Sequence, residues 1–191
     1  MRKFKLTEGL TVLALVLVAT ISACGSEDPT PTNDNELITT VNLTFTNNGM
    51  TDEVVTASFR DVDGPGGEDP VITDAQLNAN SSYTLNVQFL NDSGGPVENI
   101  TEEIVSEGLD HQVFYVIGGT ANLSYSYGDQ DSQGNPIGIT GTLTTGAAGN
   151  GTLRIILLHN PVKSASGVAN GDIGNAGGEE DIRVQFNIRT Q

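Results

Sequence analysis

From Leu37 onward, apolar and polar residues alternate along most of the chain. The alternation occurs in six segments, residues 41–45, 55–59, 83–89, 123–127, 139–143 and 182–188. A period of two is typical of a β-strand with one buried face. Segments 111–117 and 153–158 are more continuously apolar, which favours central strands. Short turns rich in Gly, Asn and Asp separate the segments, so we expect an all-β, antiparallel immunoglobulin-like β-sandwich over residues 37–191.

The spacing of Leu77 and Tyr83 supports this fold class. It resembles the tyrosine corner of fibronectin-type and other immunoglobulin-like sandwiches, in which the tyrosine hydroxyl bonds to backbone a few residues upstream. The resemblance therefore implies a loop that passes between two sheets just before Tyr83.

The chain contains one segment with a helical pattern, residues 100–107. Asn99 can cap it, Glu102 stands at its third position, and Gly108 is placed to end it. Ile100 and Ile104 would share a buried face. The sequence thus predicts one short helix within the sandwich.

The N-terminus has the pattern of a targeting signal. Three basic residues precede an apolar run, 10–21, that is too short to span a bilayer, and the only cysteine, Cys24, follows it. The pattern resembles the lipobox of bacterial lipoproteins and implies a signal peptide at 1–23, then an acylated Cys24 and a flexible tether at 24–36. Several acyl chains would anchor the chain stably. The resemblance implies the outer membrane as the site of anchoring, with the domain periplasmic or surface-exposed. The alternative is an ordinary secretory signal.

Charge and cysteine content exclude several classes of function. The net charge is −16, and it becomes −18 when residues 1–23, with three cations and one anion, are removed. A nucleic-acid partner is excluded, because binding it requires clustered Lys and Arg. With one cysteine, no intramolecular disulfide can form. The sequence contains no nucleophile elbow, no His-Glu-x-x-His and no phosphate loop, which argues against an enzyme.

Two acidic loops are candidate calcium sites. Carboxylates two residues apart, combined with glycines, can converge on one calcium ion, although neither loop has the full EF-hand register. The candidate ligands are Asp61, Asp63, Glu68 and Asp69 in the first loop, and Asp129, Asp131 and Asn135 in the second. The alternative is that both loops are ordinary tight turns, which also select Asp and Gly.

The two histidines offer a different metal chemistry. Glu103, Glu107 and His111 follow one another at intervals of four residues, and His159 ends a strand. A solvated acidic face followed by a strand is the favoured interpretation. The alternative function is a metal-dependent enzyme or metal-handling protein that uses His111, His159 and nearby carboxylates.

The chain from Leu37 onward resembles a group of uncharacterised Bacteroidota lipoproteins, some of them labelled type 1 periplasmic binding fold proteins. The resemblance rests on five stretches: 61–64, 102–115, 129–136, 153–159 and 177–182. It implies a location in the cell envelope and supplies no activity. A two-lobed binding fold needs repeated βαβ units, which this pattern does not show. We therefore expect a lipid-anchored binding or structural module, with calcium as the candidate ion that stabilises its loops and with an unknown protein or glycan partner.

Overall fold

The computed structural model describes residues 36–50 and 52–191. The expected signal peptide, Cys24 and all of the expected tether except Glu36 lie outside the described residues. The described residues belong to one compact unit, which contains its own hydrophobic core. In the described part of the chain, no helix has the length and apolar character needed to cross a membrane.

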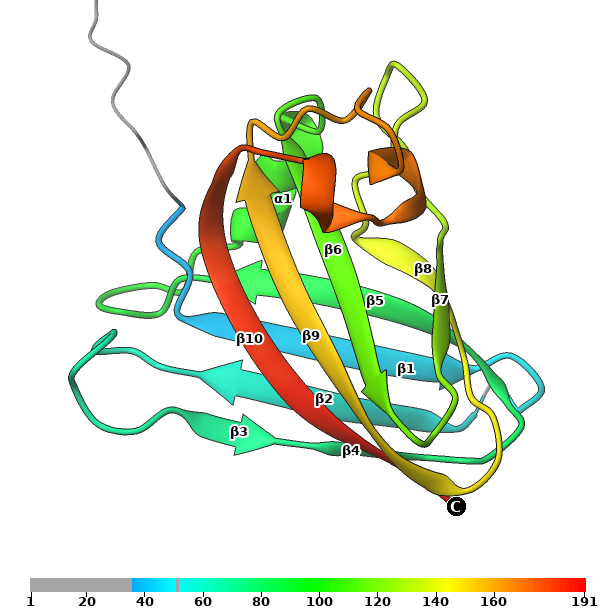
Figure 1. The fold of residues 1–191 in the computed structure, drawn as a ribbon. Helices are drawn as coiled ribbons and strands as arrows, with labels where there is room; N and C mark the ends of the chain where they lie inside the picture. Colours follow the sequence, from blue (N-terminus) through cyan, green and yellow to red (C-terminus); the bar gives the residue numbers. More distant parts are fainter. Residues whose placement is uncertain (1–35, 51) are drawn as a thin grey trace, which may run out of the picture. The chain divides into compact units, whose positions relative to one another are not determined.

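The strands form two sheets, which Figure 1 shows in sequence colours. The six-stranded sheet is antiparallel, in the order β3-β2-β1-β5-β8-β7. Its strands are β1 (Thr40–Asn47), β2 (Val54–Arg60), β3 (Val71–Thr73), β5 (Ser82–Leu90), β7 (Ser124–Tyr127) and β8 (Thr140–Thr144). The four-stranded sheet has the order β4-β10-β9-β6. Its strands are β4 (Ala75–Leu77), β6 (His111–Gly119), β9 (Gly149–His159) and β10 (Glu179–Thr190).

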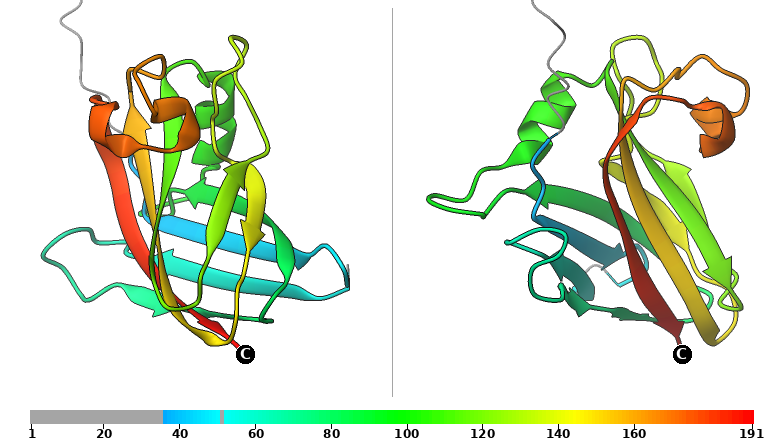
Figure 2. Two further views of the ribbon diagram at one scale, coloured as in Figure 1. Left: turned by 45° about the vertical axis from the view of Figure 1, so that its right-hand side comes forward. Right: turned by 60° about the vertical axis from the view of Figure 1, so that its left-hand side comes forward.

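The two sheets enclose one main core. Alternate residues of β1 and β5, such as Leu43 and Leu85, are fully buried and belong to the same apolar cluster as Leu153, Ile155 and Phe186 of the other sheet. The sheets lie close together near the C-terminus and diverge toward the end that carries the helix α1 (Ile100–Ser106) (Figure 2). The expected two-layered, mostly β architecture is therefore confirmed.

The predicted helix is present and ends one residue earlier than expected. Ile100 and Ile104 are buried, as the pattern indicated, and both join the main core. Asn99 precedes the helix, but its side chain bonds to the carboxylate of Glu102 instead of a backbone N–H. The helix thus occupies the wide end of the sandwich, where the two sheets no longer meet.

Two expectations about strand arrangement were wrong. The sandwich is not purely antiparallel, because β4 pairs with β10 in parallel. The strand that begins at His111, β6, is an edge strand, whereas β9 is interior. The outer face of β6 is covered by the segment that holds two short 3-10 helices, η1 (Val168–Asn170) and η2 (Ile173–Asn175), through contacts that bury Phe114. Continuous apolarity in β6 therefore reflects burial on both faces and not a central position.

The tyrosine corner is confirmed. Tyr83 is fully buried, and its hydroxyl accepts a hydrogen bond of 2.8 Å from the backbone N–H of Asn78, in the loop that passes from β4 to β5 between the sheets. Replacing Tyr83 with phenylalanine is expected to lower the free energy of unfolding by about 1 to 3 kcal/mol, because it leaves that N–H without its acceptor. Urea denaturation measures the change.

Tyr125→Phe is the matched control for this prediction. The hydroxyl of Tyr125 is buried and has no hydrogen-bond partner among residues 36–50 and 52–191, so its removal should cost less than about 0.5 kcal/mol. Equal losses from both variants would show that the Asn78 hydrogen bond does not stabilise the corner.

Candidate metal centre

Two histidines meet at the wide end of the four-stranded sheet. His111 opens β6 and His159 closes β9, and the antiparallel register places them directly opposite each other. Both belong to the inward alternation, with Val113 on one strand and Leu157 on the other. Their rings stack with centroids 4.6 Å apart and an interplanar angle of 21°. The pairing of β6 with β9 therefore joins the two histidines of the chain at one point.

A β-bulge in the third strand adds a carboxylate. The register between β10 and β9 shifts between Glu180 and Ile182, so Asp181 has no partner in the ladder. An extra residue of this kind changes the side-chain alternation and re-aims a side chain. The Asp181 side chain is fully buried, and one of its oxygens, Oδ2, lies 4.0 Å from Nε2 of His111. His111, His159 and Asp181 offer ligand atoms that all lie within 4.8 Å of one another.

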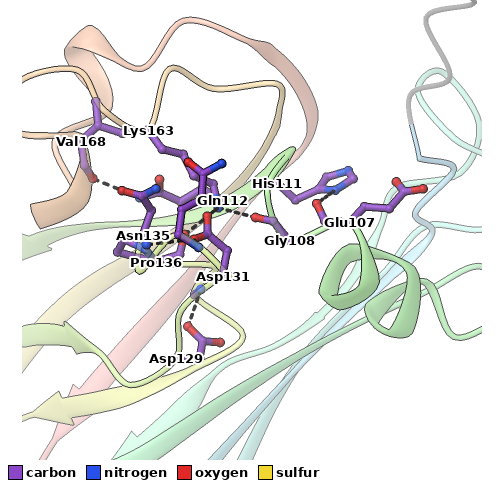
Figure 3. A network of polar contacts seen from close by, with 12 residues as sticks. Glu107, Gly108, His111, Gln112, Asp129, Asp131, Asn135, Pro136, Lys163 and Val168 are labelled. Atoms are coloured by element: carbon purple, nitrogen blue, oxygen red, sulfur yellow. Dashed lines mark hydrogen bonds and ion pairs between the residues drawn. The ribbon is translucent and has the colours of Figure 1, made fainter.

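Hydrogen bonding orients the His111 ring for metal binding. Its Nδ1 lies 3.3 Å from the backbone carbonyl of Glu107, at the end of α1 (Figure 3). A carbonyl only accepts, so Nδ1 carries the proton and Nε2 presents a lone pair. Metal-binding histidines usually donate their other N–H in this way. The free nitrogen of His111 therefore faces the carboxylate of Asp181.

Two further carboxylates surround His111. Glu36, which precedes β1, places Oε1 3.9 Å from His111 Nε2, and its side chain is 12% exposed. Glu36 and the exposed Glu107 form a second group with His111 in which the ligand atoms lie within 4.8 Å of one another. His111 is common to both groups, so it is the centre of the arrangement.

The buried groups of this centre lack protein partners. Nε2 of His111 and both carboxylate oxygens of Asp181 are buried and make no hydrogen bond of ordinary geometry with the described residues. The backbone N–H of Glu36 lies near enough to Asp181 to oppose in part the rise in its pKa, but it does not replace a full hydrogen bond. Buried polar groups in native proteins are nearly always paired, and an unpaired carboxylate is among the most costly exceptions. A lone pair and a carboxylate that face each other repel, and a cation between them would satisfy both.

Burial shifts the pKa values of the centre. Desolvation lowers the pKa of His111, which keeps the imidazole neutral and able to bind a metal. Desolvation raises the pKa of Asp181 to about 6. It also raises the pKa of Glu36, and the neighbouring charges of Glu103, Asp181 and Glu107 add to this effect. The carboxylates are thus held in a site that disfavours their own negative charge.

The donor set suits a divalent transition metal. Imidazole and carboxylate together bind zinc, and two donors at about 2.0 to 2.2 Å from one ion can be at most about 4.4 Å apart. The separations of 3.9 and 4.0 Å from His111 Nε2 to Glu36 and Asp181 satisfy this limit. His111, Asp181 and Glu36 would supply three protein ligands and leave a fourth position for water, a bound ligand or His159. A metal lies in the plane of each imidazole that binds it, so His159 would have to turn out of its stack on His111 to take that position.

The first predicted calcium loop is held by its own backbone. Asp61 accepts a hydrogen bond of 3.0 Å from the N–H of Gly64, and Asp63 accepts one of 2.8 Å from the N–H of Glu68. Glu68 and Asp69 are exposed. Among the described residues, the groups with three ligand atoms within 4.8 Å both contain His111, and neither includes this loop. Calcium binding here stays a prediction.

The second predicted calcium loop uses its carboxylates as internal acceptors. Asp129 accepts hydrogen bonds from the N–H groups of Gly138, Ile139 and Thr140 at 2.7 to 2.9 Å. Asp131 accepts from the N–H groups of Gln133 and Asn135, and its other oxygen pairs with Lys163. The structure therefore gives both aspartates roles in shaping the loop, and a calcium ion would have to displace these donors.

Sequence reasoning found part of this centre. The sequence indicates His111, His159, Glu103 and Glu107 as candidate ligands but not Asp181 or Glu36, and Glu103 belongs to neither ligand group of the described residues. Asp181 stands in an acidic run, 179–181, that gave no sign of a bulge, and Glu36 was assigned to the tether. The basis for the alternative metal interpretation is present, because the two imidazoles lie together.

Comparison of the chain with family models, curated proteins and solved structures finds no match. The resemblance to Bacteroidota lipoproteins therefore stays an expectation, and the arguments about function rest on the geometry of the centre.

Proposed function

We propose that this chain is a lipid-anchored protein of the cell envelope whose β-sandwich binds one divalent transition-metal ion, with zinc as the best-fitting ion. The observation that carries the proposal is the pair formed by His111 and Asp181. Both side chains are 0% exposed, their facing atoms are 4.0 Å apart, and neither atom has a partner among the described residues. A bound cation would offset the cost of burying this pair, whereas in an apolar core without a cation the pair would only destabilise the fold.

The composition of the centre supports a transition metal over calcium. Calcium takes six to eight oxygen ligands, whereas two imidazole nitrogens with carboxylates suit zinc, copper, nickel or iron. Nδ1 of His111 already donates to a backbone carbonyl, which is the second-shell contact that orients a ligating histidine. A metal-handling role therefore replaces calcium stabilisation as the leading interpretation.

The remaining parts of the proposal come from the sequence. Acylation of Cys24 would anchor the chain to the outer membrane, with the sandwich periplasmic or surface-exposed. The buried Tyr83 corner supports an immunoglobulin-like sandwich. The parallel pairing of β4 with β10 differs from the purely antiparallel sheets of that fold. Three protein ligands with one open position are also the arrangement of catalytic zinc sites, so a metal-dependent enzyme is the second candidate.

Zinc is expected to bind residues 25–191 with a stoichiometry of one ion per chain and to stabilise them. At a free zinc concentration about 100 times the dissociation constant, linkage gives about 2.7 kcal/mol, which raises Tm by about 5 to 11 °C for a domain of this size. Thermal unfolding with zinc, with calcium and with chelator measures the effect, and isothermal titration calorimetry gives the stoichiometry.

Matched variants identify the site. His111→Phe and Asp181→Asn should remove the response to zinc, whereas Asp69→Asn, which changes an exposed carboxylate outside the centre, should keep it. A response to calcium that Asp61→Asn abolishes would support the first acidic loop instead. The proposal is wrong if zinc produces no shift, or if its shift is the same in Asp181→Asn as in the unaltered chain.

A further inference from the structure

A cavity of about 750 Å³ lies beside the metal centre. Its walls are the segment before β1, the end of β2 with the acidic loop that follows it, and the start of β10. Glu36 and Asp181 line it, so two of the candidate ligands belong to both features. The volume is in the range of about 300 to 1,000 Å³ that is typical of small-ligand pockets. The first acidic loop and the histidine centre therefore converge on one cavity.

The lining of the cavity is strongly negative. It includes five carboxylates, and its one cation, Arg183, already pairs with Glu180. Four carboxylates remain: those of Glu36 and Asp181 at the metal centre, and those of Asp61 and Asp63 in the acidic loop. The backbone hydrogen bond from Glu68 holds the pKa of Asp63 below its usual range, so this carboxylate stays charged. One divalent ion at the centre would leave the cavity with an excess of negative charge.

Apolar side chains lie between the carboxylates. Ile38, Phe59 and Ile182 line the cavity, and Leu37, which is 59% exposed, stands among them. Pro65 and Pro70 add rigid apolar surface on the side of the acidic loop. Such a lining accepts an alkyl chain that carries a charged group.

We propose that this cavity binds a short peptide that ends in a basic residue. This inference rests on the proposed metal function. The peptide carboxylate would bind the open position of the metal, its alkyl stem would pack against Ile38 and Phe59, and its ammonium or guanidinium group would pair with Asp61 and Asp63. Asp181 belongs to the wall of the cavity, and its carboxylate, which is 0% exposed and has neither oxygen hydrogen-bonded to the described residues, faces His111 directly behind that wall.

Calorimetry with defined peptides tests this inference. The zinc-loaded chain of residues 25–191 is titrated with Gly-Gly-Arg, with Gly-Gly-Glu and with the C-terminal amide of Gly-Gly-Arg. Gly-Gly-Arg should bind more tightly than Gly-Gly-Glu by about tenfold or more, and added salt should weaken it. Amidation should weaken binding when zinc is present and have little effect in chelator, because the carboxylate contacts the metal.

Single-charge variants give the controls. Asp61→Asn and Asp63→Asn keep the oxygen that accepts the backbone N–H, and each should weaken Gly-Gly-Arg by about tenfold without changing zinc affinity. Asp69→Asn removes the same charge from the same loop outside the cavity and should change neither. Zinc binding without discrimination between the Arg and Glu peptides overturns this inference alone. A chain that does not bind zinc overturns the proposed function, and with it the metal contact inferred here.

Discussion

Replacing Lys163 with methionine is expected to lower the free energy of unfolding by about 3 to 5 kcal/mol. Lys163 is 6% exposed, and its ammonium group donates three hydrogen bonds (Figure 3). The acceptors are the carbonyls of Gly108 and Pro136 and the carboxylate of Asp131, the last at 3.0 Å. Methionine retains the length of the side chain but leaves a buried carboxylate and two carbonyls without their donor.

The size of this effect follows from the segments that Lys163 joins. Gly108 lies in the turn after α1, Asp131 and Pro136 lie in the loop between β7 and β8, and Lys163 follows β9. Their shared contact closes one end of the sandwich. Urea denaturation measures the loss, with Arg189→Met, on the exposed face of β10, as a control expected to stay within about 0.5 kcal/mol. A loss below about 1 kcal/mol for Lys163→Met would contradict the prediction.

The contact between Lys163 and Asp131 also makes the stability of the domain depend on pH in the acid range. Burial alone would raise the pKa of Asp131, but the hydrogen bonds from Lys163, Asn135 and Gln133 outweigh it and hold the pKa below its usual value. A carboxyl whose pKa is lower when folded contributes stability above the unfolded value of about 3.9, and this is lost as the pH falls through the folded value. The destabilisation by Lys163→Met should therefore diminish in strong acid.

Replacing Asp181 with valine is expected to have opposite effects with and without zinc. Without metal, the variant should be more stable than the unaltered chain by about 1 to 3 kcal/mol, because it removes a buried carboxylate that has no hydrogen-bond partner in the part of the chain that the structure describes. With zinc at about 1,000 times the dissociation constant, the unaltered chain gains about 4.1 kcal/mol and the variant does not. The order of the two stabilities should then reverse.

Denaturation in chelator and in zinc measures this reversal. Asp69→Val, at an exposed position outside the centre, should show neither effect. A metal-free Asp181→Val chain that is less stable than the unaltered one would mean that the carboxylate is supported by the fold itself. Such a result would contradict the interpretation of Asp181 as a metal ligand that destabilises the metal-free fold. Functional residues often lower the stability of a protein in this way.

Local patterns predicted most of the elements. The period of two marked β1, β2, β5, β7, β8 and β10, because one face of each strand meets the core and the other meets water. The capping residues and the paired isoleucines marked α1. The three-residue strands β3 and β4 and the helices η1 and η2 were not predicted, since so few residues carry no periodicity.

Long-range pairing decided the rest of the fold. Continuous apolarity in β6 indicated burial on two faces, yet only the docking of the segment with η1 and η2 showed that an edge strand can be buried in this way. The parallel pairing of β4 with β10 joins residues far apart in the chain. Hydrophobic periodicity indicates which faces of a strand are buried, but it does not indicate which other strands lie beside it.

The sequence alone was enough to predict a mostly β fold with one short helix, the acidic composition, the Tyr83 corner and the residue types available for chemistry. Which of these residues meet depends on the tertiary structure. The register of β6 against β9 stacks His111 on His159, and a one-residue bulge turns Asp181 inward beside them. These contacts depend on cross-strand register, which is set by the packing of whole sheets, so the metal centre could not be assembled from the linear order of its residues.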